Sequence, residues 1–433
     1  MKEKTYVEFT KDMKKDYTIF IPNMLPYHFE LISQVMKNYG YNTVLLKNSG
    51  PAVIQTGVKY VHNDTCYPAI LVIGQFINAI QTSGCDPHKV ALVYFQTGGG
   101  CRASNYISLL RKALKKAGYE YIPVISMSFS GLETHSGFKM TVPFIVKAMT
   151  AILYGDLLMS LVNQCSPYEV RKGESEELAH RFTKKIAADL KTIGLSSGLM
   201  KKQYLEVLNA FAAIERTDEK KVKVGVVGEI YVKFSPLGNN GLVDFLVNEG
   251  AEAKVPGLLD FFLYSVYDNI MDYRLYGIHR LRHYGARIAF DYLAKKQADL
   301  IGIIREHGVF EPPTPIRHTI SLVEDYIGMG TKMGEGWLLP AEMLELYDSG
   351  VKNIVCTQPF GCLPNHICGK GMMKPLKDRN PDMNIVAIDY DPGATKVNQE
   401  NRLKLMLANA RSVSTDDDGE ARPMTPEKEP AVI

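Results

Sequence analysis

Short, fully apolar segments alternate with amphipathic segments along the first part of the chain. The segment TIFIP begins at residue 18 and is followed by FELISQVMKNYG and then by TVLL. The same order returns after Lys89, where VALVYF leads through the turn QTGGG into ISLLRKALKKAGY and then into IPVISM. Fully apolar strands separated by helices are typical of parallel sheets that are covered on both faces. The pattern predicts an α/β domain over residues 1–160.

A helical pattern replaces this alternation in the middle of the chain. Five apolar residues recur there at spacings of four, four, four and three, which places them on one face of a helix: Leu178, Phe182, Ile186, Leu190 and Ile193. A second helical segment, QYLEVLNAFAAIERT, comes next, and the charged stretch TDEKKVK is typical of a linker. We therefore predict a helical connecting segment over residues 161–221.

The strand and helix pattern resumes near residue 222. The expected strands are VKVGVVGEIYV, ADLIGII, NIVC and NIVAIDY, and helical stretches such as GLVDFLVNEG and PAEMLELYDSG lie between them. A second α/β domain is expected over residues 222–408, and the polar tail 409–433 is expected to be disordered. The predicted fold class is α/β, with two doubly wound, Rossmann-like parallel-sheet domains joined by a helical segment.

Composition narrows the class of protein. A chain of 433 residues can form two or three domains, and its apolar share of 46% and charged share of 22% are ordinary for a soluble globular protein. Lys and Arg number 50 against 47 Asp and Glu, which gives a net charge of only +3 and no reason to expect a nucleic-acid or membrane partner. The first residues lack the apolar core of a signal peptide, so we expect a cytoplasmic protein.

The cysteines are the main candidates for chemistry. An odd number of thiols in a reducing compartment is poor material for a disulfide framework, so each is a small buried side chain, a ligand or a nucleophile. The chain contains seven: Cys66, Cys85, Cys101, Cys165, Cys356, Cys362 and Cys368.

Two of these thiols lie beside predicted helix starts. Cys66 comes just before Pro68, which suits the first turn of a helix, and the positive end of that helix would stabilise a thiolate. The alternative is a cysteine that only fills space. Cys101 follows QTGGG at the carboxyl end of a strand, where open α/β sheets place their sites. No nucleotide-binding fingerprint is satisfied there, and a simple tight turn is the alternative.

Three further thiols, Cys356, Cys362 and Cys368, are separated by five residues each time in NIVCTQPFGCLPNHICGKG. This spacing is not that of a zinc knuckle, but three thiols after one strand favour a soft metal. If both sheets point their carboxyl ends at a common cleft, Cys66, Cys101, Cys356 and Cys362 can converge on a single iron-sulfur cluster.

The remaining thiols have weaker claims. Cys85 and Cys165 lie at the ends of predicted helices, where a structural role is the simpler interpretation, and Cys368 is intermediate.

The cysteine-containing stretches, together with GDLLMSLVNQCSPYE, GEIYVKFSPLGNNG and IDYDPGATKVNQ, resemble a known family. They are similar to the cluster-binding region of the 2-hydroxyacyl-CoA dehydratase and double-cubane-cluster superfamily, most closely to the carboxy-terminal part of its large activase-related proteins. The resemblance covers nearly the whole chain except the tail. It implies a [4Fe-4S] or double-cubane cluster between α/β domains, with Cys66, Cys101, Cys356 and Cys362 at the matching motif positions. A double cubane would need further thiolates from Cys85, Cys165 or Cys368.

The resemblance also implies a function. In the dehydratases, a separate ATP-hydrolysing activator delivers a low-potential electron to the cluster, which passes it to a 2-hydroxyacyl-CoA thioester, and the resulting ketyl radical expels the hydroxyl group. This chain lacks a phosphate-loop signature, so its electrons would come from such a partner. The implied protein is a lyase of this type or a cluster-dependent reductase, acting on an acyl-CoA or another small substrate as a homodimer or as a heterodimer with a related subunit.

Two alternatives remain open at this point. The chain can be a non-catalytic iron-sulfur protein, with an electron-transfer or accessory role in the same family. It can also be a zinc-thiolate protein that uses the same cysteines, although the sequence offers no compact zinc knuckle.

Overall fold

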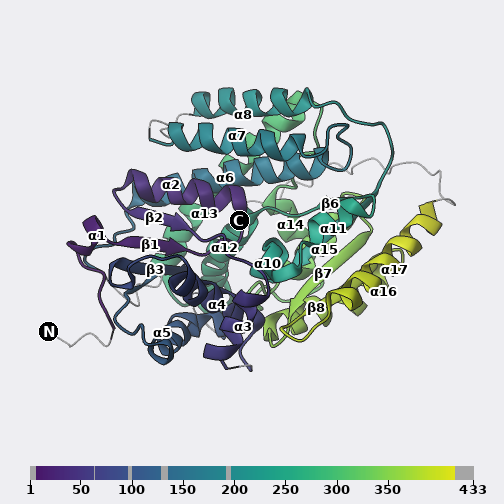
Figure 1. Ribbon diagram of the computed structural model, residues 1–433. Helices are drawn as coiled ribbons and strands as arrows, with labels where there is room; N and C mark the ends of the chain where they lie inside the picture. The colour runs from purple at the N-terminus through teal and green to yellow at the C-terminus, as the bar shows by residue number, and fades with distance from the viewer. Residues whose placement is uncertain (1–5, 63, 96–99, 128–134, 192–196, 415–433) are drawn as a thin grey trace.

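The structure is a computed structural model, and it describes residues 6–62, 64–95, 100–127, 135–191 and 197–414. It contains two four-stranded parallel sheets flanked by helices, which confirms the predicted α/β class (Figure 1). The strand order is β2-β1-β3-β4 in one sheet and β6-β5-β7-β8 in the other, so the two sheets have the same topology. The strands are β1 (Thr18–Ile21), β2 (Asn42–Leu45), β3 (Val90–Phe95), β4 (Val124–Met127), β5 (Val222–Gly228), β6 (Ala251–Lys254), β7 (Asn353–Pro359) and β8 (Asn384–Tyr390).

The helices of the first half follow the predicted pattern closely. Pro68 lies in the first turn of α4, and Gly118 ends α5 in the left-handed conformation that glycine adopts most easily. The elements are α1 (Met13–Asp16), α2 (Pro26–Asn38), α3 (Pro51–Tyr60), α4 (Tyr67–Thr82), the 3₁₀ turns η1 (Pro87–Lys89) and η2 (Arg102–Asn105), α5 (Tyr106–Ala117), α6 (Val142–Cys165), α7 (Glu174–Asp189) and α8 (Ser197–Ala212).

The second half differs from the prediction in three places. The stretch EIYV turns into a helix directly after β5, and ADLIGII forms the last turns of a long helix. A short apolar run fits a buried helix as well as a strand, so the predicted strand at ADLIGII was wrong. The fourth strand is instead AEAK, β6. The helices are α9 (Ile230–Phe234), α10 (Pro236–Asn239), α11 (Leu242–Asn248), α12 (Leu258–Tyr276), α13 (Arg280–His307), α14 (Ile316–Val323), α15 (Leu338–Asp348), the π-helical turn η3 (Asn365–Lys370), α16 (Met373–Arg379) and α17 (Lys396–Ser414).

Two hydrophobic cores cover the sheets, and each core extends through both sheets. Along β1, Ile19 and Ile21 belong to one core while Phe20 between them belongs to the other. Along β7, Ile354 joins the first core and Val355 the second. Alternate residues of a strand point to opposite faces, so each core lies on one face of the sheets. The cores therefore divide the molecule by sheet face and not by sequence half.

The long helix α6 connects the two halves. Among the described residues it alone is long and apolar enough to cross a membrane, but 67% of its apolar window is buried, as in a core helix of a soluble protein. On α6, the Asp156 carboxylate lies 2.8 Å from Nε2 of the fully buried His28 on α2. The same carboxylate accepts the backbone N–H groups of Leu258 and Leu259 at 2.7 and 2.9 Å, which caps the start of α12. A single side chain thus ties an N-terminal helix to a C-terminal helix.

The predicted connecting segment contains the end of α6 together with α7 and α8. Both of these helices lie above the first sheet in Figure 1, where α7 packs against α2 and α6 and α8 packs against α13. Four of the five apolar residues of the predicted stripe are buried, and Ile193 lies outside the described residues. At the other end, α17 continues to Ser414, so residues 409–414 are helical, and 415–433 lie outside the described residues.

Candidate functional site

The strand order fixes where a ligand site is expected. In each sheet the chain continues from its first strand to the neighbour on one side and then crosses to the neighbour on the other side. This change of direction opens a crevice at the carboxyl ends of β1 and β3 in one sheet, and of β5 and β7 in the other. Cys101 follows β3, Glu229 follows β5 directly and Cys362 follows β7. Side chains of both halves therefore occupy the positions where open α/β sheets bind ligands.

Cys66 is the N-cap residue of α4, as its position before Pro68 predicted. It is 4% exposed, and its Sγ lies 2.8 Å from the hydroxyl of Tyr106. Burial raises the pKa of the Cys66 thiol to about 11, and the Tyr106 hydrogen bond only partly opposes this. Burial thus opposes the thiolate that a position at a helix start favours.

A loop of the second half packs against Cys66. The backbone N–H of Tyr67 donates to the carbonyl oxygen of Phe360 at 3.3 Å. Gly361 has a φ of +76°, and a Cβ atom there would lie 3.6 Å from Cα of Cys66 and 3.1 Å from Nη1 of Arg102. The glycine permits this close approach, which brings the loop carrying Cys362 beside the start of α4.

Cys101 is the N-cap residue of η2, and its Sγ accepts the backbone N–H of Ala103 at 3.5 Å. Gly334, with a φ of +63°, lies so near that a Cβ atom there would be 3.8 Å from this sulfur and 3.0 Å from Cβ of Pro364. Pro364 is two residues from Cys362, so the loops that hold Cys101 and Cys362 share a neighbour. The turn residues 96–99 of the predicted QTGGG motif lie outside the described residues.

The close contacts at Gly361 and Gly334 place the three thiols in one neighbourhood, and their electrostatics agree with this. Burial raises the pKa of Cys101 to about 12, with smaller contributions from two carboxyl groups and from Cys66. Burial also raises the pKa of Cys362, with contributions from the same two carboxyl groups and from Cys101. We call Cys66, Cys101 and Cys362 the three-thiol group. Its members come from three loops and from both halves of the chain.

The structure places the other cysteines elsewhere. Cys356 lies within β7 in the core on the opposite face from the core that contains Cys66, and its Sγ is 3.9 Å from Oδ1 of Asn365. Cys368 is buried on η3, while Cys165 ends α6 within the first core. Cys85 is half-buried after α4. The structure thus brings together three of the four predicted ligands and leaves Cys356 in a separate core.

Two buried carboxyl groups adjoin the three-thiol group and were missed by the sequence analysis. Glu229 caps α9 by accepting the N–H of Val232 at 2.9 Å, and Glu335 accepts the N–H of Ile230 at 3.0 Å. Burial and their mutual repulsion raise the pKa of Glu229 to about 8, and burial raises that of Glu335 to about 7. Glu229 follows an all-apolar strand, which is the signal that identified the cysteines, whereas the glycine-rich loop around Glu335 gives no such signal.

The three-thiol group supplies sulfur donors, which are the usual ligands of iron-sulfur clusters. Among the residues with described positions, no three His, Cys, Asp or Glu side chains lie close enough to bind one metal ion. Each thiolate of a [4Fe-4S] cluster binds a different iron atom, so cluster ligands stand further apart than the ligands of one zinc ion. Soft sulfur donors, burial and the glycine cradle at Gly334 and Gly361 match what such a cluster needs.

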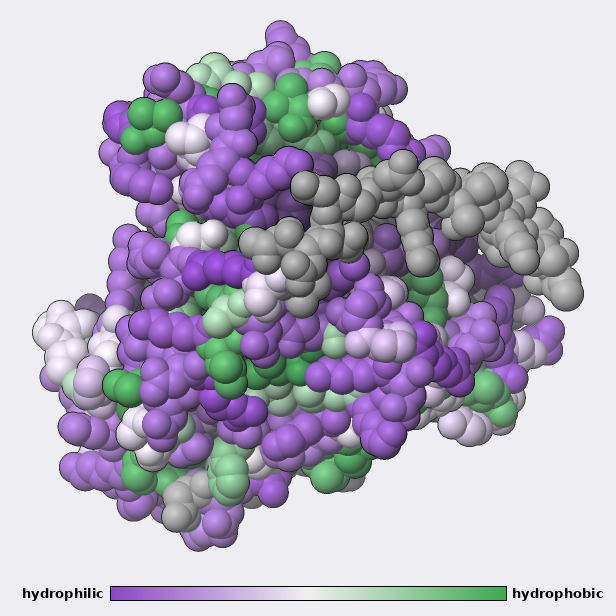
Figure 2. All heavy atoms as spheres, turned by 90° about the vertical axis from the view of Figure 1, so that its right-hand side faces the viewer, coloured by the Kyte–Doolittle hydropathy of each residue, from purple (hydrophilic) through white to green (hydrophobic). Residues whose placement is uncertain are grey.

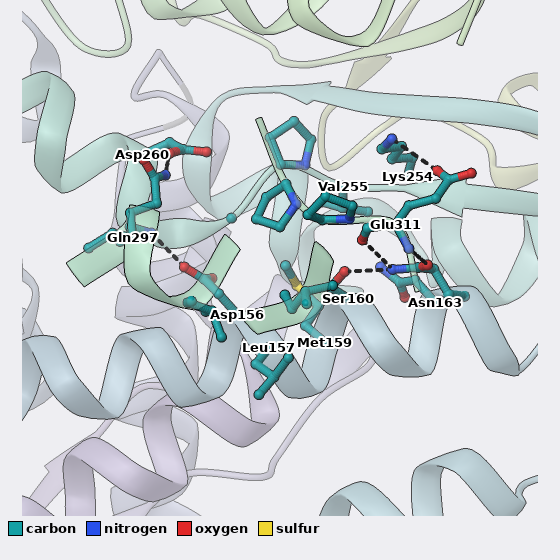
Figure 3. Close-up of a pocket in the computed structure, with 18 of the residues that line it drawn as sticks. Asp156, Leu157, Met159, Ser160, Asn163, Lys254, Val255, Asp260, Gln297 and Glu311 are labelled. Atoms are coloured by element: carbon teal, nitrogen blue, oxygen red, sulfur yellow. Dashed lines mark hydrogen bonds and ion pairs between the residues drawn. The ribbon is translucent and has the colours of Figure 1, made fainter. Parts of the chain in front are cut away.

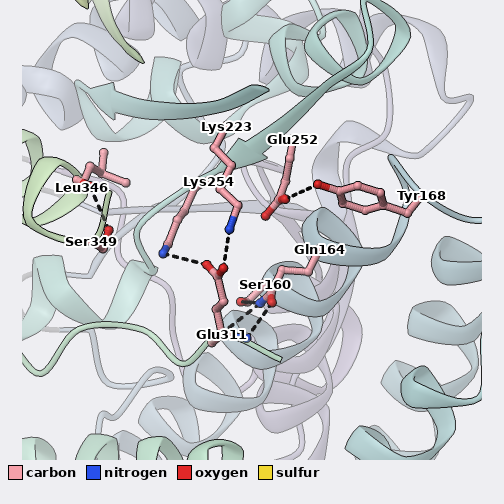
Figure 4. A network of polar contacts seen from close by, with 9 residues as sticks. All are labelled: Ser160, Gln164, Tyr168, Lys223, Glu252, Lys254, Glu311, Leu346 and Ser349. Atoms are coloured by element: carbon pink, nitrogen blue, oxygen red, sulfur yellow. Dashed lines mark hydrogen bonds and ion pairs between the residues drawn. The ribbon is translucent and has the colours of Figure 1, made fainter. Parts of the chain in front are cut away.

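Two hollows lie away from these thiols. One, of about 70 Å³, is lined by α6, by the end of β6 and by Asp260 and Gln297, which hydrogen-bond at 2.7 Å (Figure 3). The other, of about 390 Å³, contains a polar network in which Glu311 bridges Lys223 and Lys254 (Figure 4). Glu311 is paired with both lysines and Glu252 with the hydroxyl of Tyr168. None of the three thiols lines either hollow.

Comparison with known proteins adds no family assignment. The chain matches no model of a known protein family, and a search of curated proteins likewise gives no match. The resemblance drawn from the sequence motifs therefore stays a prediction, and the function has to be argued from the site.

Proposed function

We propose that this chain is an iron-sulfur protein of the 2-hydroxyacyl-CoA dehydratase type, and that Cys66, Cys101 and Cys362 are ligands of a [4Fe-4S] cluster. One observation carries the proposal: the loops that hold these three thiols come from distant parts of the sequence and pack against one another at the carboxyl ends of two parallel sheets. Thiolates are the usual ligands of such clusters, and this edge of a sheet is the usual place for a site.

The surroundings of the thiols suit metal binding more than nucleophilic catalysis. Their raised pKa values keep them protonated at neutral pH, so binding of the cluster would displace their protons. Burial excludes water from Cys66 and Cys362, and the Tyr106 hydroxyl supplies a hydrogen bond to the Cys66 sulfur, a contact that tunes cluster potentials. The cluster, when bound, supplies one-electron chemistry; the chain holds it and shields it.

The proposal also includes the more specific properties that the family resemblance implies. Cys356 remains a predicted fourth ligand, and a double-cubane cluster would still require additional thiols. A separate ATP-hydrolysing activator would supply electrons in the cytoplasm, and the substrate would be an acyl-CoA or another small molecule. We propose that Arg102 binds the anionic part of this substrate, because it is exposed and its guanidinium lies beside Gly361 and near Cys66. We also retain α7 and α8 as a segment that joins two Rossmann-like domains.

Anaerobic purification tests the proposal. The wild-type chain should contain iron and acid-labile sulfide, and it should give an electron paramagnetic resonance signal after reduction with dithionite. Cys101→Ala and Cys362→Ala should each lose most of this iron and signal. Cys85→Ala is the matched control, because Cys85 lies outside the three-thiol group, and it should retain both.

Two results would contradict the proposal. One is an iron-free protein from an anaerobic preparation that is folded by circular dichroism. The other is zinc at one ion per chain with no labile sulfide, which would favour the zinc-thiolate alternative.

A further inference from the structure

The larger hollow lies at the opposite end of the second sheet from the three-thiol group. It has a volume of about 390 Å³, and Lys223 near the start of β5 and Glu252 near the start of β6 lie on its walls. The end of α6, the connecting segment and the loop after α13 complete these walls. We call it the β5–β6 hollow. Its volume is within the range of sites that bind small molecules.

The charges on the walls of the β5–β6 hollow are only partly balanced. Lys223 pairs with Glu311, and Asp218 is exposed to water. Two charged groups remain, Glu252 and Arg216. Scattered apolar residues, such as those that Figure 2 shows among hydrophilic ones on the side of α17, are ordinary on a protein surface. Charges without ionic partners on the wall of a hollow are a more specific sign of a ligand.

Glu252 is a buried carboxylate without a cation beside it. It is 5% exposed, and its Oε2 atom accepts the hydroxyl of Tyr168 at 2.7 Å (Figure 4). Lys223 is its paired neighbour across the two strands, but the amino group of that lysine bonds Glu311 instead. Among the residues that the structure describes, Oε1 of Glu252 has no hydrogen-bond partner and the carboxylate has no ion-pair partner. A buried charge in this state is suited to receive a cationic group from a ligand.

Arg216 lies on the wall that the connecting segment forms. Its guanidinium lies over the ring of Phe310, with Cζ 5.1 Å from the ring centroid, and this contact holds the planar group in place. Within the part of the chain that the structure describes, Arg216 forms no ion pair with a carboxylate. A guanidinium held in this way can bind a carboxylate through two parallel hydrogen bonds.

The same walls also include apolar side chains. Ile214 and Phe310 are buried, and Val309 is half-exposed at the rim. These side chains offer contact to an apolar part of a ligand. The β5–β6 hollow therefore combines an anionic group, a cationic group and an apolar surface.

We propose that the β5–β6 hollow binds a free α-amino acid with an apolar side chain. The ammonium group of this ligand pairs with Glu252, and its carboxylate pairs with Arg216. A zwitterion satisfies both groups at once, whereas a simple cation or a simple anion would leave one of them without a partner. The bound ligand joins the connecting segment to β6, so it stabilises the folded chain in proportion to its concentration and affinity.

Thermal unfolding and isothermal titration calorimetry of the full-length protein test this inference. The probes are L-valine, L-leucine and L-phenylalanine, and at least one of them should bind and raise the melting temperature. For L-leucine, two matched fragments separate the charges: 4-methylpentanoate lacks the amino group, and 3-methylbutylamine lacks the carboxylate. Each fragment should bind at least about tenfold more weakly than L-leucine, because it loses one ion pair.

Two variants assign the charges to their residues. Glu252→Gln should weaken binding of L-leucine by about tenfold or more but leave binding of 4-methylpentanoate unchanged, because that fragment has no ammonium group. Arg216→Gln should likewise weaken L-leucine but not 3-methylbutylamine. A residue with a purely structural role would affect the amino acid and its fragments alike. Arg171→Gln is the control, because Arg171 is an exposed residue of the connecting segment that lies outside the hollow, and it should bind L-leucine as the wild type does.

Three results would overturn the inference. They are a folded wild-type protein that binds none of the three amino acids at millimolar concentration, fragments that bind as tightly as L-leucine, and unchanged L-leucine binding in a folded Glu252→Gln variant. None of these measurements depends on iron, so they are independent of the proposed cluster.

Discussion

The two halves of the molecule share a strand order but supply the candidate site with different groups. The first half contributes two thiols, Cys66 and Cys101, from loops around β3 and α4. The second half contributes one thiol, Cys362, and two buried carboxyl groups, Glu229 and Glu335. Equivalent strand ends thus carry different chemistry, as expected when function resides in loops on a common scaffold.

The interior of the second half also differs from that of the first half in its buried charges. Lys233 and Glu342 form a buried ion pair at 2.8 Å, with both side chains 4% exposed, among the carboxyl groups that surround the site. Apart from Glu169 of the connecting segment, the buried Asp, Glu and Lys side chains of the described residues all lie in the second half. The ion pair between Lys185 and Glu206, on α7 and α8 of the connecting segment, is exposed. The second half therefore concentrates buried charge, and changes to that charge are the sharpest way to test the comparison.

The largest effect on stability is expected from Lys233→Met. Removing one member of a buried pair leaves an uncompensated carboxyl group, so we expect the free energy of unfolding to fall by about 3 kcal/mol. Urea denaturation measures this. Lys185→Met is the matched control and should change the free energy by less than about 1 kcal/mol. Adding Glu342→Leu to Lys233→Met should recover much of the loss; a double variant as unstable as the single one would argue against a charge effect.

The next prediction concerns pH and the metal-free protein. The folded-state pKa values of Glu229 and Glu335, about 8 and 7, lie above their ordinary value of 4.5. Between pH 4.5 and pH 8 the folded state therefore binds more protons than the unfolded state. Stability should be greatest below this window and should fall as pH rises through it, by at most about 1.4 kcal/mol per pH unit for each group.

Variants assign this pH dependence to particular groups. Glu229→Gln should flatten the profile between pH 5 and pH 8 in part, because Glu345 and Asp268, with pKa values raised by burial to about 7, remain. Glu311→Gln is the control and should leave the slope between pH 5 and pH 8 unchanged, because Glu311 is ionised throughout this range in both the folded and the unfolded state. Burial acts to raise the pKa of Glu311, but Lys223 and Lys254 lower it overall. An unchanged slope in Glu229→Gln, measured by urea denaturation across this range, would contradict the prediction.

The smallest effects are expected at the glycines where the halves meet. Gly334 and Gly361 both have positive φ, so alanine at either position should cost about 1 kcal/mol from the backbone alone. Gly334→Ala should cost more, because its nearest neighbour is the rigid ring of Pro364, whereas Gly361 faces the flexible end of Arg102. Gly84→Ala isolates the backbone cost, since its φ is +68° and nothing lies within 4 Å. Equal thermal melting shifts in all three variants would show that the close contacts at Gly334 and Gly361 contribute little.

Sequence patterns predicted most strands because each of these strands contains a short apolar run. The sequence indicates strands between turns at β1, β3, β5 and β7. β6 was missed because its sequence, AEAK, consists of weak strand formers and is held in place by pairing with β5. ADLIGII was misassigned because a short apolar run fits a buried helix as well as a strand, and here it forms the last turns of α13.

The candidate site was only partly predictable for a similar reason. The rule that sites follow the carboxyl ends of parallel strands identified the loops of Cys101 and Cys362. That rule does not distinguish the two faces of a strand, so it could not show that Cys356 lies within β7, in the core on the opposite face from Cys66. The contact between Glu335 and the helix start at Ile230 joins residues 105 positions apart, and no local pattern encodes it.

The two shared cores have a mechanical consequence. Proteins with two Rossmann-like units often open and close like a clamp, with a cleft that widens as the units rotate. Here each layer of packed side chains continues from one sheet into the next, and Asp156 bonds helices on both sides. A rotation of that kind would have to disrupt the packing of both layers at once. Entry to the buried thiols is therefore a matter of small displacements in the loops above the strand ends, while the spacing of those loops stays fixed by the interior beneath them.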